Sequence, residues 1–268
     1  SIITIDFETY YDKDYSLSKK MTTEEYVNDA RFEVIGMGIK VDGEPSRWVT
    51  GGNVASTLKS FDWSQHAILC HNTLFDGAIL SWKFGVKPGF WLDTLCMARA
   101  LHGVDAGGSL KTLAERYNIG EKGDEVIHAM GRKLADFTAA DLDRYGAYCR
   151  NDVDLTYRLL HCLQPFPDNE LKLINLTLRM YTQPVLEVND ALLIQRLEEV
   201  KDEKSRLLTS LAERLNCADE EEVRKKLSSN PQFAEILLTR GITPPKKISP
   251  ATGKETLALA KNDEGFIA

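Results

Sequence analysis

Two carboxylates near the start of the chain, Asp6 and Glu8, are the first residues whose types and spacing could support chemistry. Residues two apart on a strand project to the same face, while Ile3, Ile5 and Phe7 form an apolar opposite face. This alternation predicts a strand that is buried for most of its length. Two adjacent negative charges on a buried strand cost free energy unless a cation compensates them. The pair therefore indicates a cation site, and an exposed strand end is the alternative explanation.

A second polar pair, Asn72 and Asp76, lies four residues apart where an apolar strand ends and a helix begins. An ordinary helix start explains this pair equally well. Asn72 or Thr73 would then cap the helix, and the helix dipole would favour Asp76 in the first turn. The motif alone leaves both interpretations open.

A third pair, Tyr148 and Asp152, lies inside a long helical stretch from Thr138 to Leu163. A spacing of four places both side chains on one helix face. Tyr145 and Leu155 extend the same stripe, so we expect Asp152 to face inward with the aromatic rings. The alternative is a solvated surface face, which the charged neighbours of Asp152 would suit.

The elements that must position these pairs alternate between strands and helices. Further strands are predicted at 33–41, 47–49 and 66–70, and helices at 74–84, 109–117 and 138–163. Strands dominate early and helices later. We therefore expect an α/β fold with a mixed sheet flanked by helices over residues 1–167.

From residue 168 onward the pattern becomes helical. Helices are predicted at 170–181 and 190–215, followed by two short helices that open near Asp219 and Asn230. The stretch after Gly241 contains several prolines and is expected to be extended and loosely held. Residues 168–268 are therefore predicted to form a second, all-helical segment.

Composition narrows the class of protein. The 268 residues are 43% hydrophobic, which is enough for a substantial core and excludes disordered and collagen-like chains. Five cysteines without Cys-x-x-Cys spacing indicate neither a disulfide framework nor a zinc site. The absence of a long apolar run and of a leader-like start predicts a cytoplasmic protein with no membrane partner.

The net charge of −7 argues against a nucleic-acid partner, but the charge is unevenly distributed. Residues 223–261 contain eight basic and two acidic side chains, a balance of +6 that leaves −13 on the remainder. We therefore expect a basic tail that could follow a DNA backbone.

Taken in order, the three pairs resemble the motifs of the 3′→5′ exonuclease superfamily with four acidic residues on an RNase H-like fold. The tyrosine subclass, which includes the proofreading domains of family A DNA polymerases, fits best, because Ala147 stands where the histidine subclass has histidine. The first and second aspartates are 70 residues apart, and Asp76 and Tyr148 are 72 apart, which is similar to family A domains. The matching residues are Asp6 and Glu8, Asn72 and Asp76, and Tyr148 and Asp152.

Later segments also resemble phage-type family A polymerases. These are 33–36, 93–94, 109–114, 177–180, 183–187, 229–233 and 247–250. The resemblance implies that residues 168–268 are the linker and part of the thumb. It also implies a palm and fingers domain, joined covalently or as a split subunit, because those parts are not in the sequence. A monomer is expected, although a homodimer through 190–215 is an alternative.

The resemblance further implies two divalent cations, Mg²⁺ or Mn²⁺, since carboxylate ligands suit these ions. Asp6 would bridge the two ions, Glu8 and Asp152 would hold the ion on the nucleophile side, and Asp76 would reach the other through water. Tyr148 would orient the attacking water. The implied reaction removes 3′-terminal nucleotides from single-stranded DNA or a frayed primer terminus.

Candidate substrate contacts lie around the first two motifs and in a loop before the third: Asn72, Phe7, Thr9, Tyr11 and His128. Tyr10 or Tyr11 would take the place of an apolar wedge at the terminal base, with core packing or surface exposure as the alternative for either. Two other functions compete with this interpretation. An RNA-processing exonuclease of the same superfamily would share the catalytic residues, and a non-catalytic interaction domain would not need them.

Overall fold

The computed structural model describes residues 1–17, 21–123 and 129–267 and divides into two compact units, Ser1–Val185 and Leu186 onward. The division lies later than the 167/168 boundary expected from the sequence. Helix α7 (Asp168–Thr182) belongs to the first unit because it packs on the sheet and buries Leu178 there. Its Asn175 side chain accepts a 2.9 Å hydrogen bond from the backbone N–H of Trp91.

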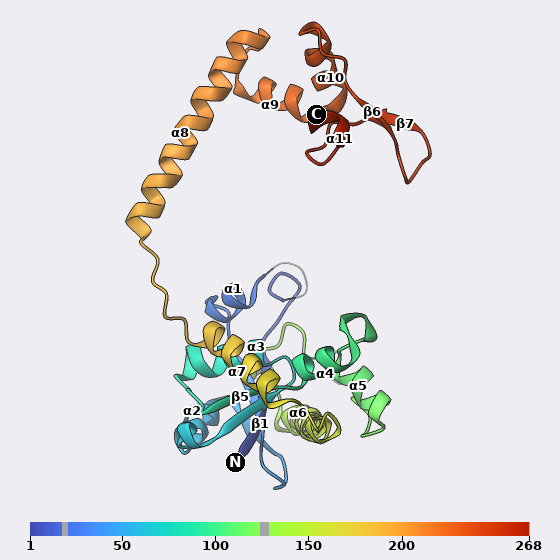
Figure 1. Ribbon diagram of the computed structural model, residues 1–268. Helices are drawn as coiled ribbons and strands as arrows, with labels where there is room; N and C mark the ends of the chain where they lie inside the picture. The colour runs from blue at the N-terminus through green and yellow to red at the C-terminus, as the bar shows by residue number, and fades with distance from the viewer. Residues whose placement is uncertain (18–20, 124–128, 268) are drawn as a thin grey trace. The chain divides into compact units, whose positions relative to one another are not determined.

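A mixed five-stranded sheet forms the centre of the first unit (Figure 1). Its strands are β1 (Ile2–Thr9), β2 (Val34–Val41), β3 (Arg47–Thr50), β4 (Ala67–Cys70) and β5 (Phe90–Asp93), in the order β3-β2-β1-β4-β5. β1, β2 and β3 pair antiparallel, while β4 and β5 continue the sheet parallel to β1. The predicted mixed sheet is confirmed. β5 was not predicted.

Helices cover both faces of this sheet. The helices before α7 are α1 (Thr23–Asn28), α2 (Gly51–Lys59), α3 (Thr73–Ala78), which continues as a π-helical turn (Ile79–Lys83), α4 (Thr94–His102), α5 (Leu110–Tyr117) and α6 (Ala139–Cys162). Short 3₁₀ turns lie at Trp63–Gln65, Val104–Ala106 and Leu134–Asp136. α2, α3 and α7 supply buried residues to the core on one face, and α4, α5 and α6 to the core on the other.

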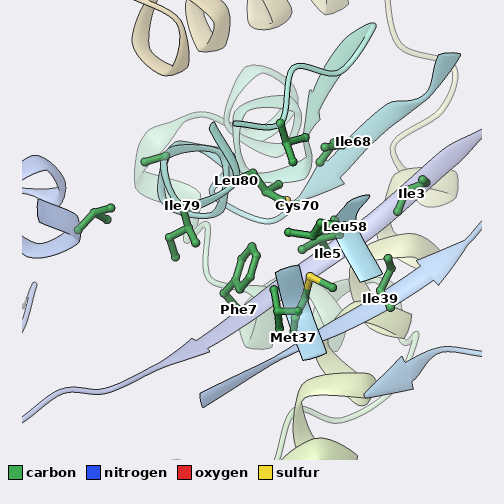
Figure 2. Packing of buried hydrophobic residues seen from close by; sticks show 14 of the residues in the cluster. Ile3, Ile5, Phe7, Met37, Ile39, Leu58, Ile68, Cys70, Ile79 and Leu80 are labelled. Atoms are coloured by element: carbon green, nitrogen blue, oxygen red, sulfur yellow. The ribbon is translucent and has the colours of Figure 1, made fainter. Parts of the chain in front are cut away.

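Strand β1 separates the two cores as its alternation predicted. Figure 2 shows Ile3, Ile5 and Phe7 on one face, packed with Met37 and Ile39 of β2. The other face of β1 carries Asp6 and Glu8 toward α6. The carboxylates are thus placed by the hydrophobic burial of their neighbours.

A glycine in β2 lets α6 approach this face of the sheet closely. Gly38 pairs with Asp6 across the β1–β2 ladder. A Cβ at Gly38 would lie 2.8 Å from Val153 Cγ2 and 2.9 Å from Cys149 Sγ, and 3.1 Å from the Cys149 carbonyl oxygen. Only a residue without a side chain therefore fits under α6 at this point.

We expect Gly38→Ala to lower the free energy of unfolding by about 2 kcal/mol, because the added methyl group overpacks the contact between β2 and α6. Urea denaturation of the full chain measures this. Gly43→Ala is the matched control, since a Cβ there meets nothing within 4 Å. Equal losses for the two variants would contradict the close contact.

The second unit is mostly helical. It contains α8 (Asp190–Leu215), α9 (Glu220–Ser228), α10 (Asn230–Thr239), β6 (Lys246–Ile248), β7 (Glu255–Leu257) and α11 (Glu264–Ile267). The bounds of α8 match the prediction, and Asp219 caps α9 by accepting a hydrogen bond from Glu222 N–H. The tail after Gly241 differs from the expectation of an extended chain, because β6 and β7 form an antiparallel hairpin.

Most cations of the basic tail expected over residues 223–261 have a carboxylate partner. Five of its eight cations form ion pairs: Arg224 with Glu220, Lys225 with Glu221, Lys226 with Glu222, Lys246 with Glu255 and Lys247 with Asp263. Three of these carboxylates stand just before Val223 and complete helical pairs at a spacing of four. These surface pairs do not change the count of charges in the segment, and its contact with a DNA backbone stays a prediction. Within the described ranges, none of the helices combines the length and hydrophobicity that a membrane crossing requires.

Candidate active site

The first unit brings the four predicted carboxylates together from three elements. Asp6 and Glu8 come from β1, Asp76 from the first turn of α3 and Asp152 from the middle of α6. The negative charge of Asp6 raises the pKa of both Glu8 and Asp76, and the charge of Asp152 raises the pKa of Asp6. Asp6 is thus the carboxylate that interacts electrostatically with each of the other three.

Burial is the main reason why these groups resist ionisation. It raises the pKa of Asp6 to about 7 and the pKa values of Glu8 and Asp76 well above their ordinary range. Burial also raises the pKa of Asp152, although a neighbouring lysine opposes that shift. Negative charges crowded in a buried site require added positive charge to remain ionised together. The cluster therefore has the electrostatic character of a cation site.

Asp76 is aimed at β1 by a specific hydrogen bond. Its Oδ1 accepts from the backbone N–H of Phe7 at 3.0 Å, which joins two positions 69 residues apart. The side chain of Asn72 does not cap α3; instead Asn72 adopts a left-handed backbone with φ of 69°. The simple capping interpretation of this motif was therefore wrong for Asn72.

A buried aspartate outside the three predicted pairs holds the start of α3. Asp93, only 1% exposed, accepts hydrogen bonds from the backbone N–H groups of Asn72 at 3.1 Å and Thr73 at 3.0 Å. The same carboxylate caps α4 by accepting from Leu95 N–H at 2.8 Å. One side chain at the end of β5 therefore fixes two helix starts, one of which carries Asp76. The sequence signal for Asp93 is the Asp-Thr pair that opens a helix. The other helix start that Asp93 holds lies about 20 residues earlier in the chain.

Tyr148 and Asp152 both face inward, which confirms the expectation of a buried stripe on α6. Asp152 is 3% exposed, and its Oδ2 accepts from Lys122 Nζ at 2.6 Å. Within the described part of the chain, Oδ1 of Asp152 has no hydrogen-bond partner. Burial raises the pKa of Tyr148 above its usual range, so its hydroxyl stays neutral and can donate a hydrogen bond. The outward position on α6 belongs to Asp154, which pairs with Lys40 at 3.0 Å.

A cysteine also lies at the cluster. Cys149 Sγ donates to the backbone oxygen of Asp6 at 3.3 Å and to its Oδ2 at 3.4 Å. Ligand atoms of Asp6, Glu8 and Cys149 all lie within 4.8 Å of one another, a spacing at which they could share an ion. Cys149 belongs to no cysteine or histidine motif, so nothing in the sequence predicts its position at the cluster.

A cavity of about 530 Å³ opens beside Glu8. Its lining includes three of the predicted substrate contacts, Phe7, Thr9 and Tyr11, together with Phe75, Met130 and Tyr145. The Phe7 ring is mostly buried and stacks on Phe84, and the Thr9 hydroxyl bonds to the Tyr26 hydroxyl at 2.8 Å. Among the described residues, Asn72 does not line this cavity, and His128 lies outside the part of the chain that the structure describes.

Comparisons with known proteins agree with this arrangement. Residues 51–166 match a protein family described as 3′-5′ exonuclease. A search of the curated proteins found no match.

Solved structures with a similar fold include RNase D of Trypanosoma brucei, at 17% sequence identity and a TM-score of 0.52, with 71% of this chain and 69% of that chain covered. The same protein in complex with RNA U12 gives 16% identity, a TM-score of 0.52 and coverage of 71% and 67%. NrnC of Brucella melitensis gives 18% identity, a TM-score of 0.47 and coverage of 68% and 81%.

The likeness to RNase D establishes the RNase H-like fold that the sequence predicted. The family match and the convergence of four carboxylates with a buried tyrosine support a 3′–5′ exonuclease domain of the superfamily with four acidic residues.

Proposed function

We propose that this protein removes nucleotides one at a time from the 3′ end of single-stranded or frayed DNA, in a reaction that depends on divalent cations. The observation that carries the proposal is the convergence of Asp6, Glu8, Asp76 and Asp152 beside Tyr148. A phosphodiester is anionic, so its hydrolysis depends on positioned positive charge and an activated water molecule. A cluster of this kind suits that task.

The residues present fit divalent cations. The carboxylates are buried together with raised pKa values, one oxygen of Asp152 has no partner among the described residues, and a lysine ammonium already lies against the other. Carboxylate oxygens favour Mg²⁺ or Mn²⁺. When bound, such ions would neutralise charge on the phosphate oxygens and lower the pKa of a bound water.

The four carboxylates, with Asp6 central among them, would hold these ions. Tyr148 would hold the attacking water through its neutral hydroxyl. Asp76 has one oxygen engaged by Phe7 N–H, as Asp6 has one engaged by Cys149 Sγ. The role of Asp76 through water follows only from the resemblance to the exonuclease motifs.

The cavity beside Glu8 suits the terminal nucleotide. Tyr11, Phe75 and Met130 offer ring and thioether surfaces on which any base can stack, as an enzyme without sequence preference needs. We propose that Tyr11 lies against the terminal base. The frayed 3′ end would be delivered by polymerase palm and fingers parts, covalently joined or in a separate subunit.

A second candidate substrate is RNA, since RNase D of Trypanosoma brucei has a similar fold and was solved with RNA U12. The carboxylates would perform the same chemistry on either nucleic acid. The preference for DNA rests on the resemblance of the segments after residue 168 to family A polymerases.

The test is digestion of 5′-labelled single strands of DNA and RNA of the same sequence by the full chain in Mg²⁺. We expect a ladder that shortens from the 3′ end, a rate on DNA at least about tenfold above that on RNA, and complete loss of activity in EDTA. A faster rate on RNA would favour the second candidate. Internal cutting, or digestion that persists in EDTA, would contradict the proposed reaction.

A further inference from the structure

A lysine ammonium lies inside the carboxylate cluster. Nζ of Lys122 is 2.6 Å from Oδ2 of Asp152, and the lysine side chain is 28% exposed. Its positive charge lowers the pKa values of Asp6 and Glu8 as well as that of Asp152, so its field reaches three of the four carboxylates. Nζ also lies 5.5 Å from the centre of the Tyr148 ring.

The backbone holds Lys122 at this place. Just before it, the carbonyl of Glu121 accepts a 2.9 Å hydrogen bond from Asn151 Nδ2, and the carbonyl of Ile119 accepts a 3.0 Å bond from Arg158 Nη1. Both donors are side chains of α6, the helix that carries Asp152. The loop is therefore tied to the same helix as the carboxylate that Lys122 contacts.

We propose that Lys122 is a resident cation of the candidate metal centre, which competes with a divalent ion for Asp152 and so raises the metal concentration at which the centre fills. The inference rests on the proposed metal-binding role of Asp152. Mg²⁺ binds carboxylate oxygens at about 2.1 Å, so an ion on Oδ2 of Asp152 would share that oxygen with an ammonium 2.6 Å away, and the two cations would repel each other. The flexible four-carbon stem of lysine and its partial exposure permit the ammonium to withdraw from the ion.

Charge repulsion strengthens the competition. An ammonium and a divalent cation in a partly buried site repel each other more strongly than they would in water. Because binding linkage is reciprocal, each cation weakens the other by the same factor. A neutral side chain at position 122 would remove this factor, whereas arginine would keep it.

The experiment is calorimetric titration of the full chain with Mn²⁺ at one pH and ionic strength. Lys122→Met, and Lys122→Gln as a second neutral variant, are expected to bind at least one Mn²⁺ ion about tenfold more tightly than the unaltered chain, within the usual range of coupling between sites. Lys122→Arg is expected to stay within about threefold. Lys111→Met removes the same charge from an exposed position on α5 and is expected to leave the affinity unchanged.

Unchanged or weaker affinity in both neutral variants, with thermal unfolding confirming that they are folded, would overturn the competition. An equal gain in Mn²⁺ affinity in Lys111→Met would also overturn it, because the gain would then follow from the net charge of the chain and not from the place of Lys122. The proposed function is tested separately in the same series by Asp152→Asn. If the unaltered chain binds no Mn²⁺, or Asp152→Asn binds it equally well, the metal role of Asp152 is wrong and the inference falls with it. If only the neutral Lys122 variants fail to tighten binding, the proposed function stands and this inference alone is wrong.

Discussion

Asp6→Asn is expected to lower the rate of release of 3′-terminal nucleotides by about 100- to 1000-fold, the usual cost of removing one group that stabilises developing charge. Asp6 is the carboxylate that the other three share electrostatically, and its neutral isostere cannot hold a cation in the same way. Single-turnover digestion of a 5′-labelled DNA strand in saturating Mg²⁺ measures the rate. Asparagine keeps the shape of the side chain, so the fold should be retained.

The matched control is Asp143→Asn, which neutralises an exposed aspartate on α6. We expect that variant to digest DNA at the rate of the unaltered chain. Full activity of Asp6→Asn would exclude Asp6 from the reaction, and an equal loss in both variants would point to a general charge effect.

Asp93→Ala is expected to lower the free energy of unfolding by about 3 kcal/mol or more. The substitution removes the acceptor for N–H groups at the starts of both α3 and α4, and leaves them inside a buried region without a partner. Urea denaturation of the full chain measures the loss. Activity should fall as well, because α3 carries Asp76.

Ser109→Ala provides the comparison for an ordinary helix cap. Ser109 accepts from Thr112 N–H at the exposed start of α5, and its loss should cost about 1 kcal/mol. If Asp93→Ala costs no more than Ser109→Ala, then Asp93 is a single local cap and does not join two helices.

Three of the four candidate carboxylates lie in a local pattern with a clear period, whereas Asp76 was assigned through the resemblance of the three pairs to the exonuclease motifs. The alternation of β1 separates Asp6 and Glu8 from its apolar face, and the spacing in α6 puts Asp152 with the buried rings. The bounds of α6 and α8 were predictable for the same reason, since long periodic segments give the strongest signal.

Other parts of the site depend on contacts between residues far apart in the chain. Lys122 reads as a surface cation, because nothing near it in sequence indicates that Asp152 lies 2.6 Å from its ammonium. Asp93 serves a helix that begins about 20 residues earlier. The ion pairs of the first three cations of the basic tail were not foreseen, because the counted window began after Glu222 and so omitted their carboxylate partners.

The most direct test of the central claim is a crystal structure of the full chain grown with Mn²⁺, in which anomalous scattering locates the ions. We predict manganese peaks bound by oxygens of Asp6, Glu8 and Asp152, with the ammonium of Lys122 withdrawn from Asp152. Manganese absent from the cluster, or bound only elsewhere while the carboxylates keep their present contacts, would contradict the assignment of a metal-dependent exonuclease.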